Sequence, residues 1–367
     1  MRVVLFVHSL ASDWNHGNAH FLRGVVAELQ ARGHEVRVHE PRAGWSRESL
    51  VRDHGEEPLR RFAERFPHLR SSAYDLDELD LGAALDGAHL VLVHEWTDPA
   101  LVGRIGERRA HGSFTLLFHD THHRAVTRPE EMVRYDLAHY DGVLAFGEVL
   151  RSLYLERDWA VQAWTWHEAA DTRVFRPLEP DEPRHDLVWI GNWGDGERTQ
   201  ELETFLLGPA RELGLSGTVH GVRYPEAARE AVTASGLDYG GWLPNADAPR
   251  VFARHRATVH VPRRPYVEAL PGIPTIRPFE AMACGIPLVS APWDDVEGLF
   301  RGGDDHLVAR DGRELRNALR SVLADEELAA SLRREGLRTI AERHTCAHRV
   351  DELLAIVAEL RPEALAA

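Results

Sequence analysis

The chain contains no lysine. Its 43 basic residues are all arginine, against 58 Asp and Glu, and the formal net charge is −15. Without lysine, neither a Walker A phosphate loop nor a Schiff-base mechanism is possible. Any diphosphate must therefore be held by arginine, by helix N-termini or by a metal ion. The acidic balance also argues against general binding to nucleic acid.

Cysteine and long apolar runs are scarce as well. The two cysteines, Cys284 and Cys346, lie far apart in sequence and indicate no disulfide framework. No run of about 18 apolar residues occurs, so we expect no membrane-spanning helix and no strong attachment to a membrane. The first residues, 1–8, are typical of a buried strand and not of a signal peptide. We therefore expect a cytoplasmic protein.

Short apolar segments alternate with helical patterns along the chain, which predicts βαβ units and a parallel sheet. A stretch rich in proline and acidic residues, 170–185, interrupts the alternation and is predicted to be a linker. Positions 40–88 lack the alternation, and we expect helices and loops there, over one sheet edge and beside a bound substrate. The predicted strands are 2–7, 35–39, 89–94, 113–119, 142–146 and 160–164, then 186–191, 217–221, 257–261, 286–290 and 306–308.

The most informative segment is 271–290, PGIPTIRPFEAMACGIPLVS. It predicts a loop, a short helix with Thr275 as N-cap, a left-handed Gly285 that ends the helix, and a strand. A helix N-terminus attracts phosphate, and Arg277 adds a full charge in the first turn. Glu280 lies one turn further on, where a carboxylate can accept two hydrogen bonds from a sugar diol. This combination suits a nucleotide-sugar; the alternative is a crossover helix with a solvated Glu280.

Segment 271–290 resembles the donor-binding segment of GT-B glycosyltransferases. Its Arg-x-Phe-Glu form is similar to the CgeB-like group, near glycosyltransferase family 4. The resemblance implies an α/β fold with two Rossmann-like parallel-sheet domains facing a cleft. Residues 1–172 would form the acceptor-side domain and 173–347 the nucleotide-sugar-binding domain, with the helix 348–367 crossing back onto the first.

The resemblance also implies roles for two positions of this segment. In family 4, two glutamates lie eight positions apart. The second matches Glu280 and implies a contact with the ribose. The first would fall at position 272, where this chain has Gly272. This departure bears on the sugar specificity and on the stereochemistry.

Candidate catalytic residues in the first half follow predicted strands, because parallel sheets place ligands at the carboxyl ends of strands. His119 matches the strand-end histidine that, in family 4, contacts the donor sugar and the reacting phosphate. Asp13 and His16 follow the first strand, where inverting GT-B enzymes deprotonate the acceptor, and an imidazole titrates near neutral pH. Alternatively, Asp13 is a turn residue and His16 is a solvated side chain. Gly17 allows the backbone to approach a ligand.

Two patterns in the first half invite a metal ion. His119, His122 and His123 are close in sequence, but neighbouring histidines on a loop need not converge. The stretch Asp75–Asp77 looks like the Asp-x-Asp motif of GT-A transferases. It lies among polar residues, and we expect a solvated helix start there. We predict no metal, and no cofactor besides the NDP-sugar co-substrate.

Candidate donor-binding residues in the second half also follow strands. Arg198 comes after the glycine-rich stretch 191–196, and the resemblance implies that it pairs with the β-phosphate. Arg263 and Arg264 follow the strand that ends at Val261, and either one of them faces the donor or both are solvated. The segment 239–244 resembles the loop that holds the nucleotide base, and Trp242 stacks on the base or belongs to the core.

Together these patterns predict a metal-independent glycosyltransferase of the hexosyltransferase type. The donor is an NDP-sugar, and the acceptor is a saccharide, a lipid-linked molecule or a small molecule. The family 4 resemblance favours retention of configuration. Two alternatives stay open, a sugar-nucleotide epimerase and a nucleotide-sugar-binding protein without turnover. Gly272 is the feature that invites the second.

Overall fold

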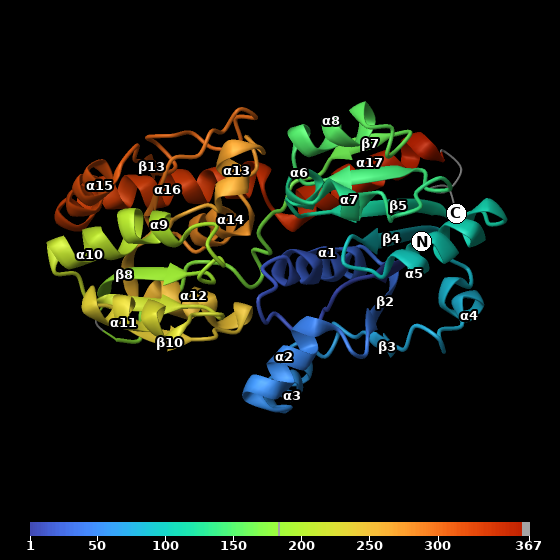
Figure 1. Ribbon diagram of the computed structural model, residues 1–367, viewed down its shortest axis with the longest axis horizontal. Coiled ribbons are helices and arrows are strands. Elements are labelled where there is room, and N and C mark those ends of the chain that lie inside the picture. The colour runs from blue at the N-terminus through green and yellow to red at the C-terminus, as the bar shows by residue number, and fades with distance from the viewer. Residues whose placement is uncertain (183, 362–367) are drawn as a thin grey trace. The chain divides into compact units, whose positions relative to one another are not determined.

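The computed structural model describes residues 1–182 and 184–361 (Figure 1). It divides into two compact units. Unit 1 comprises Met1–Glu168 and the C-terminal segment from Cys346, and unit 2 comprises Ala169–Thr345. The sequence patterns placed these boundaries slightly later, after residues 172 and 347. The parallel α/β fold class is confirmed in both units.

Unit 1 contains one seven-stranded sheet with the strand order β3-β2-β1-β4-β5-β6-β7. Every strand pair in it is parallel. The central strands β1, β4, β5 and β6 are nearly continuous apolar runs because helices cover both faces of a parallel sheet. Their bounds are β1 (Arg2–Phe6), β2 (Glu35–Pro41), β3 (Ser72–Tyr74), β4 (Leu90–His94), β5 (Thr115–Asp120), β6 (Gly142–Ala145) and β7 (Ala163–Thr165).

The helices of unit 1 connect these strands, and the last one comes from the far end of the chain. That helix, α17, packs against α1, and the backbone carbonyl of Arg349 accepts a hydrogen bond from the Trp166 indole at 2.8 Å. Residues 362–367, the rest of the predicted crossing segment, lie outside the described residues. The helices are α1 (Ala19–Ala31), α2 (Trp45–His54), α3 (Glu57–Arg65), α4 (Leu81–Leu85), α5 (Pro99–Ala110), α6 (Arg124–Thr127), α7 (Pro129–Met132), α8 (Glu148–Glu156) and α17 (Cys346–Leu360).

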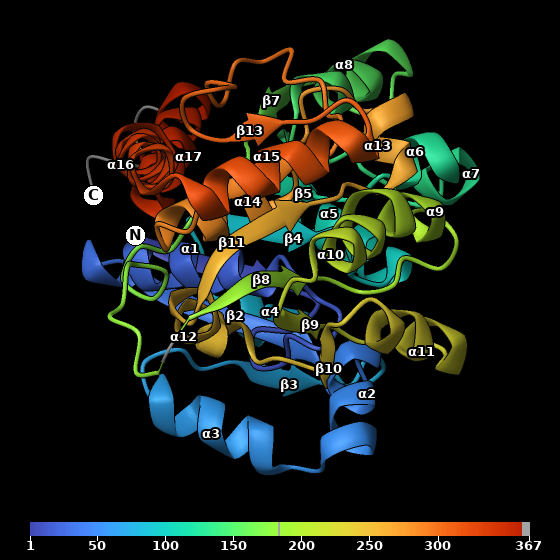
Figure 2. The ribbon, with the colours of Figure 1, turned by 90° about the vertical axis from the view of Figure 1, so that its left-hand side faces the viewer.

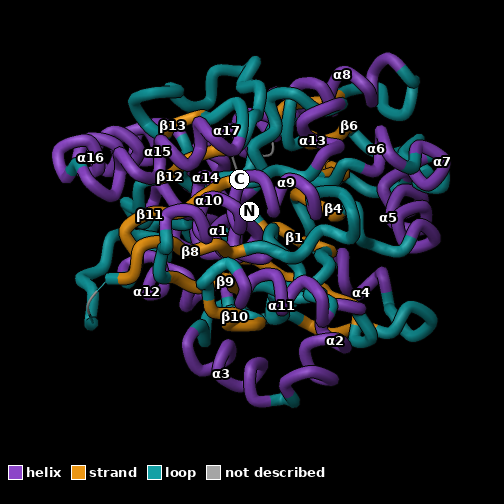
Figure 3. The backbone as a smooth tube through the Cα atoms, turned by 60° about the vertical axis from the view of Figure 1, so that its left-hand side comes forward, coloured by secondary structure: helices purple, strands orange, loops and turns teal. Residues whose placement is uncertain are grey.

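Unit 2 contains a six-stranded sheet with the order β10-β9-β8-β11-β12-β13, again with parallel pairs (Figure 2). Helices and strands alternate along the chain of unit 2 (Figure 3). Its strands are β8 (His185–Ile190), β9 (Gly217–His220), β10 (Asp238–Gly241), β11 (His255–His260), β12 (Leu288–Ser290) and β13 (Leu307–Val308). Its helices are α9 (Thr199–Leu202), η1 (Glu203–Leu207), α10 (Gly208–Leu213), α11 (Glu226–Ala234), η2 (Asn245–Asp247), α12 (Ala248–Ala253), α13 (Arg264–Glu268), α14 (Ile276–Ala283), α15 (Gly312–Ala324) and α16 (Glu326–Arg343).

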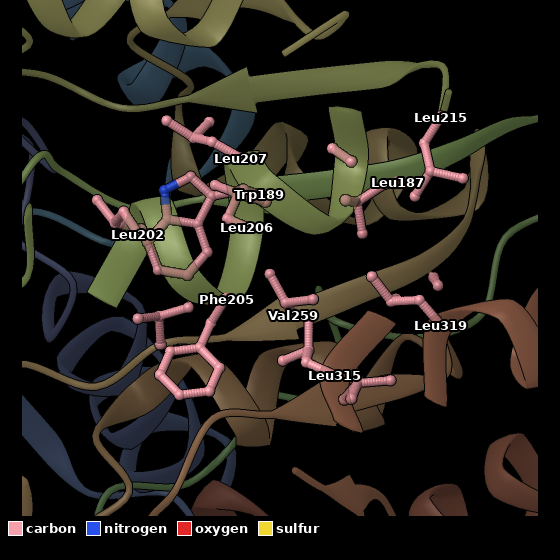
Figure 4. Close-up of a cluster of buried hydrophobic side chains, with 14 of the residues drawn as sticks. Leu187, Trp189, Leu202, Phe205, Leu206, Leu207, Leu215, Val259, Leu315 and Leu319 are labelled. Carbon is pink, nitrogen blue, oxygen red and sulfur yellow. The ribbon is translucent and has the colours of Figure 1, made fainter. Parts of the chain in front are cut away.

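The core of unit 2 lies between its sheet and the helices that cover it. Figure 4 shows Trp189 of β8, Val259 of β11 and Leu315 of α15 among the buried side chains. Leu315 and Leu319 are one helical turn apart and both are fully buried, so a single stripe of α15 supplies this contact. The core holds the central strands β8 and β11 in place, and with them the loops at their carboxyl ends.

Two short strands were not predicted from the sequence. Residues 40–88 contain helices and loops as expected, but also β3, a three-residue edge strand without apolar alternation. β10 contains Gly240 and Gly241, which are unfavourable in strands, and it lies at the other sheet's edge.

The expectation of a helix start at Asp75–Asp77 was wrong, because this stretch is a turn directly after β3. Asp75 accepts a hydrogen bond from Arg42 at 2.8 Å. The next helix begins at Leu81 with Asp80 as its N-cap. Within the described ranges, no helix has both the length and the apolar character that crossing a bilayer requires.

Candidate functional site

Three arginines gather at the carboxyl edge of the unit 2 sheet: Arg198 follows β8, Arg263 follows β11, and Arg277 lies in the first turn of α14. We call them the arginine cluster. Burial first, and then the positive charges of Arg263 and Arg277, lower the pKa of Arg198 to about 9. The fold therefore brings together the three arginines that the sequence analysis singled out for donor binding.

Arg198 is held by neutral oxygen atoms. Its guanidinium donates hydrogen bonds to the carbonyl and side-chain oxygens of Asn192 at 2.7 and 2.6 Å, and to the Val261 carbonyl at 3.2 Å. It also lies 5.1 Å from the ring centroid of Trp189. In the part of the chain that the structure describes, no carboxylate forms an ion pair with it. Arg198 is thus a half-buried cation that no carboxylate of the described residues contacts directly, although the charge of Glu197 raises its pKa.

Arg263 differs from Arg198 because it has an acidic partner. Its guanidinium forms an ion pair with Glu197 at 2.6 Å and donates to the Asn192 side chain at 3.0 Å. Asn192 therefore links the two arginines through one oxygen atom. The link fixes their spacing at the end of β8 and β11.

The helix α14 begins at Ile276, directly after Thr275. Thr275 has φ +60° and its side chain makes no capping hydrogen bond, so the expected side-chain cap is absent. Gly285 does take the predicted left-handed conformation after the helix, with φ +66°. Glu280 is fully buried and forms an ion pair with Arg277 across one turn of α14.

Gly272 lies at the position of the first of the two family 4 glutamates, and Glu297 occupies the adjacent space. Gly272 has φ +87°, and a Cβ atom added there would lie 2.6 Å from the Glu297 carboxylate. The Gly272 amide donates to the Asp294 carbonyl at 2.8 Å, which joins the loop before α14 to the loop after β12. A carboxylate is therefore present beside position 272, but another loop supplies it. No local sequence pattern indicated Glu297.

Trp242 directly follows β10 and is half-buried, so it lies at the same carboxyl edge as the other strand ends of unit 2. Its role in base stacking stays a prediction.

In unit 1, four histidines form a row at the ends of β1, β4 and β5. The ring centroids are 5.1 Å apart for His8 and His16, 6.3 Å for His16 and His94, and 5.3 Å for His94 and His119. All four are buried. Burial lowers the pKa of His8 to about 4, that of His119 to about 3, and those of His16 and His94 well below the usual value. This histidine row is therefore neutral at neutral pH.

His119, the leading catalytic candidate, packs against Trp166 and Phe21, with ring centroids 4.8 and 6.0 Å away. Its Nε2 atom is buried and has no hydrogen-bond partner among the described residues. The neutral ring can donate or accept one hydrogen bond at this atom, depending on its tautomer.

The two candidate bases are both constrained. Asp13 accepts a hydrogen bond from Arg23 at 2.9 Å, and both side chains are buried. His16 has a lowered pKa, caused first by burial and then by the charges of His8 and Arg23, so it holds a transferred proton poorly. Gly17 is half-buried in the turn before α1; Asn15, not Gly17, takes the left-handed conformation, with φ +49°.

A second buried polar group lies beside the histidine row. Glu95 is fully buried and forms an ion pair with Arg124; burial raises the pKa of Glu95 to about 8, and the Arg124 charge opposes that shift. Asp120 accepts a hydrogen bond from the Tyr154 hydroxyl at 2.7 Å and from the His122 amide at 3.0 Å.

Within the described ranges, no group of three His, Cys, Asp or Glu side chains is arranged to hold a metal ion.

Comparison with known proteins bears on the fold. Solved structures that cover 98% of this chain include sucrose-phosphate synthase from Thermosynechococcus elongatus (TM-score 0.66, 18% identity, 98% of that chain), an alpha-glucosyltransferase in complex with UDP and DNA (0.70, 12%, 99%), and Anabaena Alr3699/HepE with UDP and glucose (0.65, 12%, 100%). The chain has the GT-B fold of these structures. Residues 198–355, which include Arg198, Arg263 and Arg277, match the family model described as glycosyl transferase-like. No curated protein sequence matches the chain.

Replacing Gly272 by alanine tests the contact with Glu297. The left-handed backbone strains any other residue, at about 1–3 kcal/mol, and the added Cβ also meets the Glu297 carboxylate. We expect the melting temperature to fall for Gly272→Ala. It should fall less for Gly303→Ala, because Gly303 has φ +93° but nothing within 4 Å of the added atom.

The double variant Gly272→Ala/Glu297→Ala should recover part of the loss, since the collision is removed and the backbone strain stays. If the double variant is less stable than expected from the sum of the single effects, the two residues do not collide.

Proposed function

We propose that this GT-B protein transfers a sugar from a nucleoside-diphosphate sugar to an acceptor, without a metal ion. The observation that carries this proposal is the arginine cluster, and above all Arg198, a half-buried cation with which no carboxylate of the described residues forms an ion pair. Partial desolvation of a cation without such a partner costs free energy until an anion binds. A diphosphate supplies that anion at the carboxyl edge of a parallel sheet, where ligands of such folds bind.

The same residues supply the main need of glycosyl transfer. The nucleoside diphosphate leaves with additional negative charge, and catalysis requires groups that stabilise this charge as it develops. Arg198, Arg277 and the N-terminus of α14 lie at one sheet edge and have the positive charge to do so. HepE and the alpha-glucosyltransferase were solved with UDP, so UDP is the first nucleotide to test.

Donor binding would exchange the partners of Arg277 and Glu280. In the structure the two side chains form an ion pair with each other. A bound nucleotide-sugar offers phosphate oxygens to Arg277 and ribose hydroxyls to Glu280, so each buried charge keeps a partner. This exchange explains why a fully buried glutamate lies beside an arginine near a helix N-terminus.

We further propose that transfer proceeds with retention of configuration. An inverting enzyme needs a side-chain base for the acceptor hydroxyl. Asp13 is engaged by Arg23, and the lowered pKa of His16 makes it a weak base. A retaining route in which the leaving phosphate assists the acceptor avoids this requirement. The anomeric proton signal of the product distinguishes the two routes.

A transfer assay with EDTA tests the reaction as a whole. Purified protein is incubated with UDP-sugars and a saccharide mixture, with and without EDTA. Equal product formation in both arms supports the metal-free proposal, and loss that only a divalent ion restores contradicts it. Donor consumption without any transfer product points to an epimerase or hydrolase, and binding without consumption points to a non-catalytic protein.

The variant Arg198→Gln should lose donor affinity but not stability. A charge-assisted hydrogen bond contributes about 1.5–3 kcal/mol, so we expect the dissociation constant for UDP to rise about tenfold or more. The melting temperature without ligand should stay equal or rise, because the variant removes a half-buried guanidinium charge that has no ion-pair partner. Calorimetry and thermal unfolding measure the two quantities.

Arg264→Gln is the matched control for this variant. Arg264 is bound to Glu201 at 3.0 Å and lies outside the arginine cluster, so UDP affinity should not change. Equal UDP affinity of Arg198→Gln and Arg264→Gln would remove Arg198 from the donor site.

The variant Glu280→Ala tests the ribose contact. We expect it to weaken UDP binding about tenfold while leaving the binding of 2′,3′-dideoxy-UDP unchanged, because only UDP offers the diol. Calorimetric titration of both nucleotides, with the wild-type protein beside the variant, gives the comparison. An equal loss for both nucleotides means that Glu280 acts through Arg277 and not on the ribose.

A further inference from the structure

Three tryptophans of unit 1 gather at the carboxyl edge of its sheet, next to His8. Trp14 lies in the loop after β1, Trp45 is the first residue of α2, and Trp96 follows β4 (Figure 3 labels these elements). Ring centroids are 5.7 Å apart for Trp14 and Trp45 and 6.1 Å for Trp45 and Trp96. The His8 ring lies 5.0 Å from Trp45 and 5.8 Å from Trp96. We call Trp14, Trp45 and Trp96 the tryptophan cluster.

Hydrogen bonds and close contacts hold the tryptophan cluster in this arrangement. The Ser46 hydroxyl, in α2, donates to the Trp14 carbonyl at 2.8 Å and lies 2.9 Å from the Ser12 hydroxyl. A Cβ atom added at Gly44 would lie 3.4 Å from the His8 carbonyl, so glycine allows the start of α2 to approach the end of β1. The cluster is therefore preorganised by the β1 loop and by α2.

Unused hydrogen-bonding atoms surround the tryptophan cluster. The indole N–H groups of Trp14 and Trp45 and the Nε2 atoms of His8 and His16 are buried and have no partner among the described residues. Buried polar atoms of this kind normally have a partner, and four of them in one cluster indicate a polar ligand or water. The histidines are neutral here, so these atoms form uncharged hydrogen bonds.

The charges beside the tryptophan cluster are already paired. Arg124 stacks on Trp96, 4.4 Å from the ring centroid, and forms an ion pair with Glu95. Arg52, which lies 5.9 Å from the Trp14 ring, forms an ion pair with Asp53 at 2.8 Å. Among the described residues, both arginines that lie over the cluster are therefore already in ion pairs, which a phosphate or carboxylate on the ligand would have to break.

We propose that the tryptophan cluster binds an uncharged sugar ring. A pyranose has an apolar C–H face that packs on an indole, and a rim of hydroxyl groups that both donate and accept hydrogen bonds. Such a ring matches the half-buried Trp45 and Trp96, together with the unused atoms of His8 and Trp45. Binding would require a side-chain rotation of Trp45 that uncovers these buried atoms.

The role of this sugar ring rests on the proposed function: it would be the acceptor of the transfer reaction. Of the three acceptor classes expected from the sequence, a neutral saccharide is then the one that fits. Sugar binding itself does not depend on catalysis, so the two ideas can fail separately.

Titration of the full-length protein with defined sugars tests the proposal. The neutral probes are methyl α-D-glucopyranoside and maltotriose, and the charged probes are glucose 6-phosphate and glucuronate. Saturation-transfer NMR detects binding and tryptophan fluorescence measures affinity. We expect the neutral probes to bind at least tenfold more tightly than the charged ones.

Two variants locate the site. Trp45→Ala should weaken neutral-sugar binding at least tenfold, whereas Trp45→Phe should keep most of it because the ring is retained. Trp159→Ala is the matched control, since Trp159 is another half-buried tryptophan of unit 1 that lies outside the cluster. Its affinity for sugars should equal that of the wild-type protein.

Several results would overturn the proposal: no binding of either neutral probe, equal or tighter binding of the charged probes, or equal effects of Trp45→Ala and Trp159→Ala. UDP titration of the same samples separates this outcome from failure of the proposed function. If UDP binds and neutral sugars do not, only the sugar site is wrong. If neutral sugars bind and no UDP-sugar is consumed, the proposed transfer reaction is wrong and the sugar site stands.

Discussion

In both sheets every strand pair is parallel, so each connection has to cross over and return the chain to the same edge. This constraint positions all the polar groups discussed above. Arg198 and Arg263 follow different strands of unit 2, and His94 and His119 lie at the ends of neighbouring strands of unit 1. The middle parts of the strands form the apolar interior of each sheet, and the polar residues of the site lie at the strand ends.

The absence of lysine gives the arginines of unit 2 a particular character. A guanidinium has five N–H donors in a plane, so neutral oxygens can orient it while its charge stays available. Arg198 is oriented in this way by Asn192 and Val261. On the proposed function, a bound diphosphate would offset the cost of partly desolvating this cation, and donor affinity would then come at some expense of stability, as is common at functional sites.

Local patterns in the sequence were sufficient for most of the fold. Buried apolar runs such as β1, β4, β5 and β8 are long enough to be recognised, and the helix α14 carries its own Gly285 stop signal. β3 and β10 are short edge strands without such patterns, and they pair only because a neighbouring strand offers a free edge.

Sequence patterns did not predict the features that depend on contacts between distant segments. Gly272 could be recognised as a departure, but not Glu297, whose approach requires the hydrogen bond between the loops before α14 and after β12. The tryptophan cluster needs β1 and β4 to be neighbours in the sheet. The imidazole of His16 was expected to titrate near neutral pH, and burial, which no sequence pattern reports, lowers its pKa instead.

The helix α17 belongs to unit 1 but is encoded after all of unit 2. On the ribosome, unit 2 is a continuous segment and emerges whole before α17 has been made. Unit 1, although its sheet is synthesised first, lacks the partner of α1 and of Trp166 until then. Domains generally fold in the order of synthesis, and here the order is partly reversed: the unit that begins first is completed last, with an exposed apolar stripe on α1 for as long as unit 2 takes to be translated.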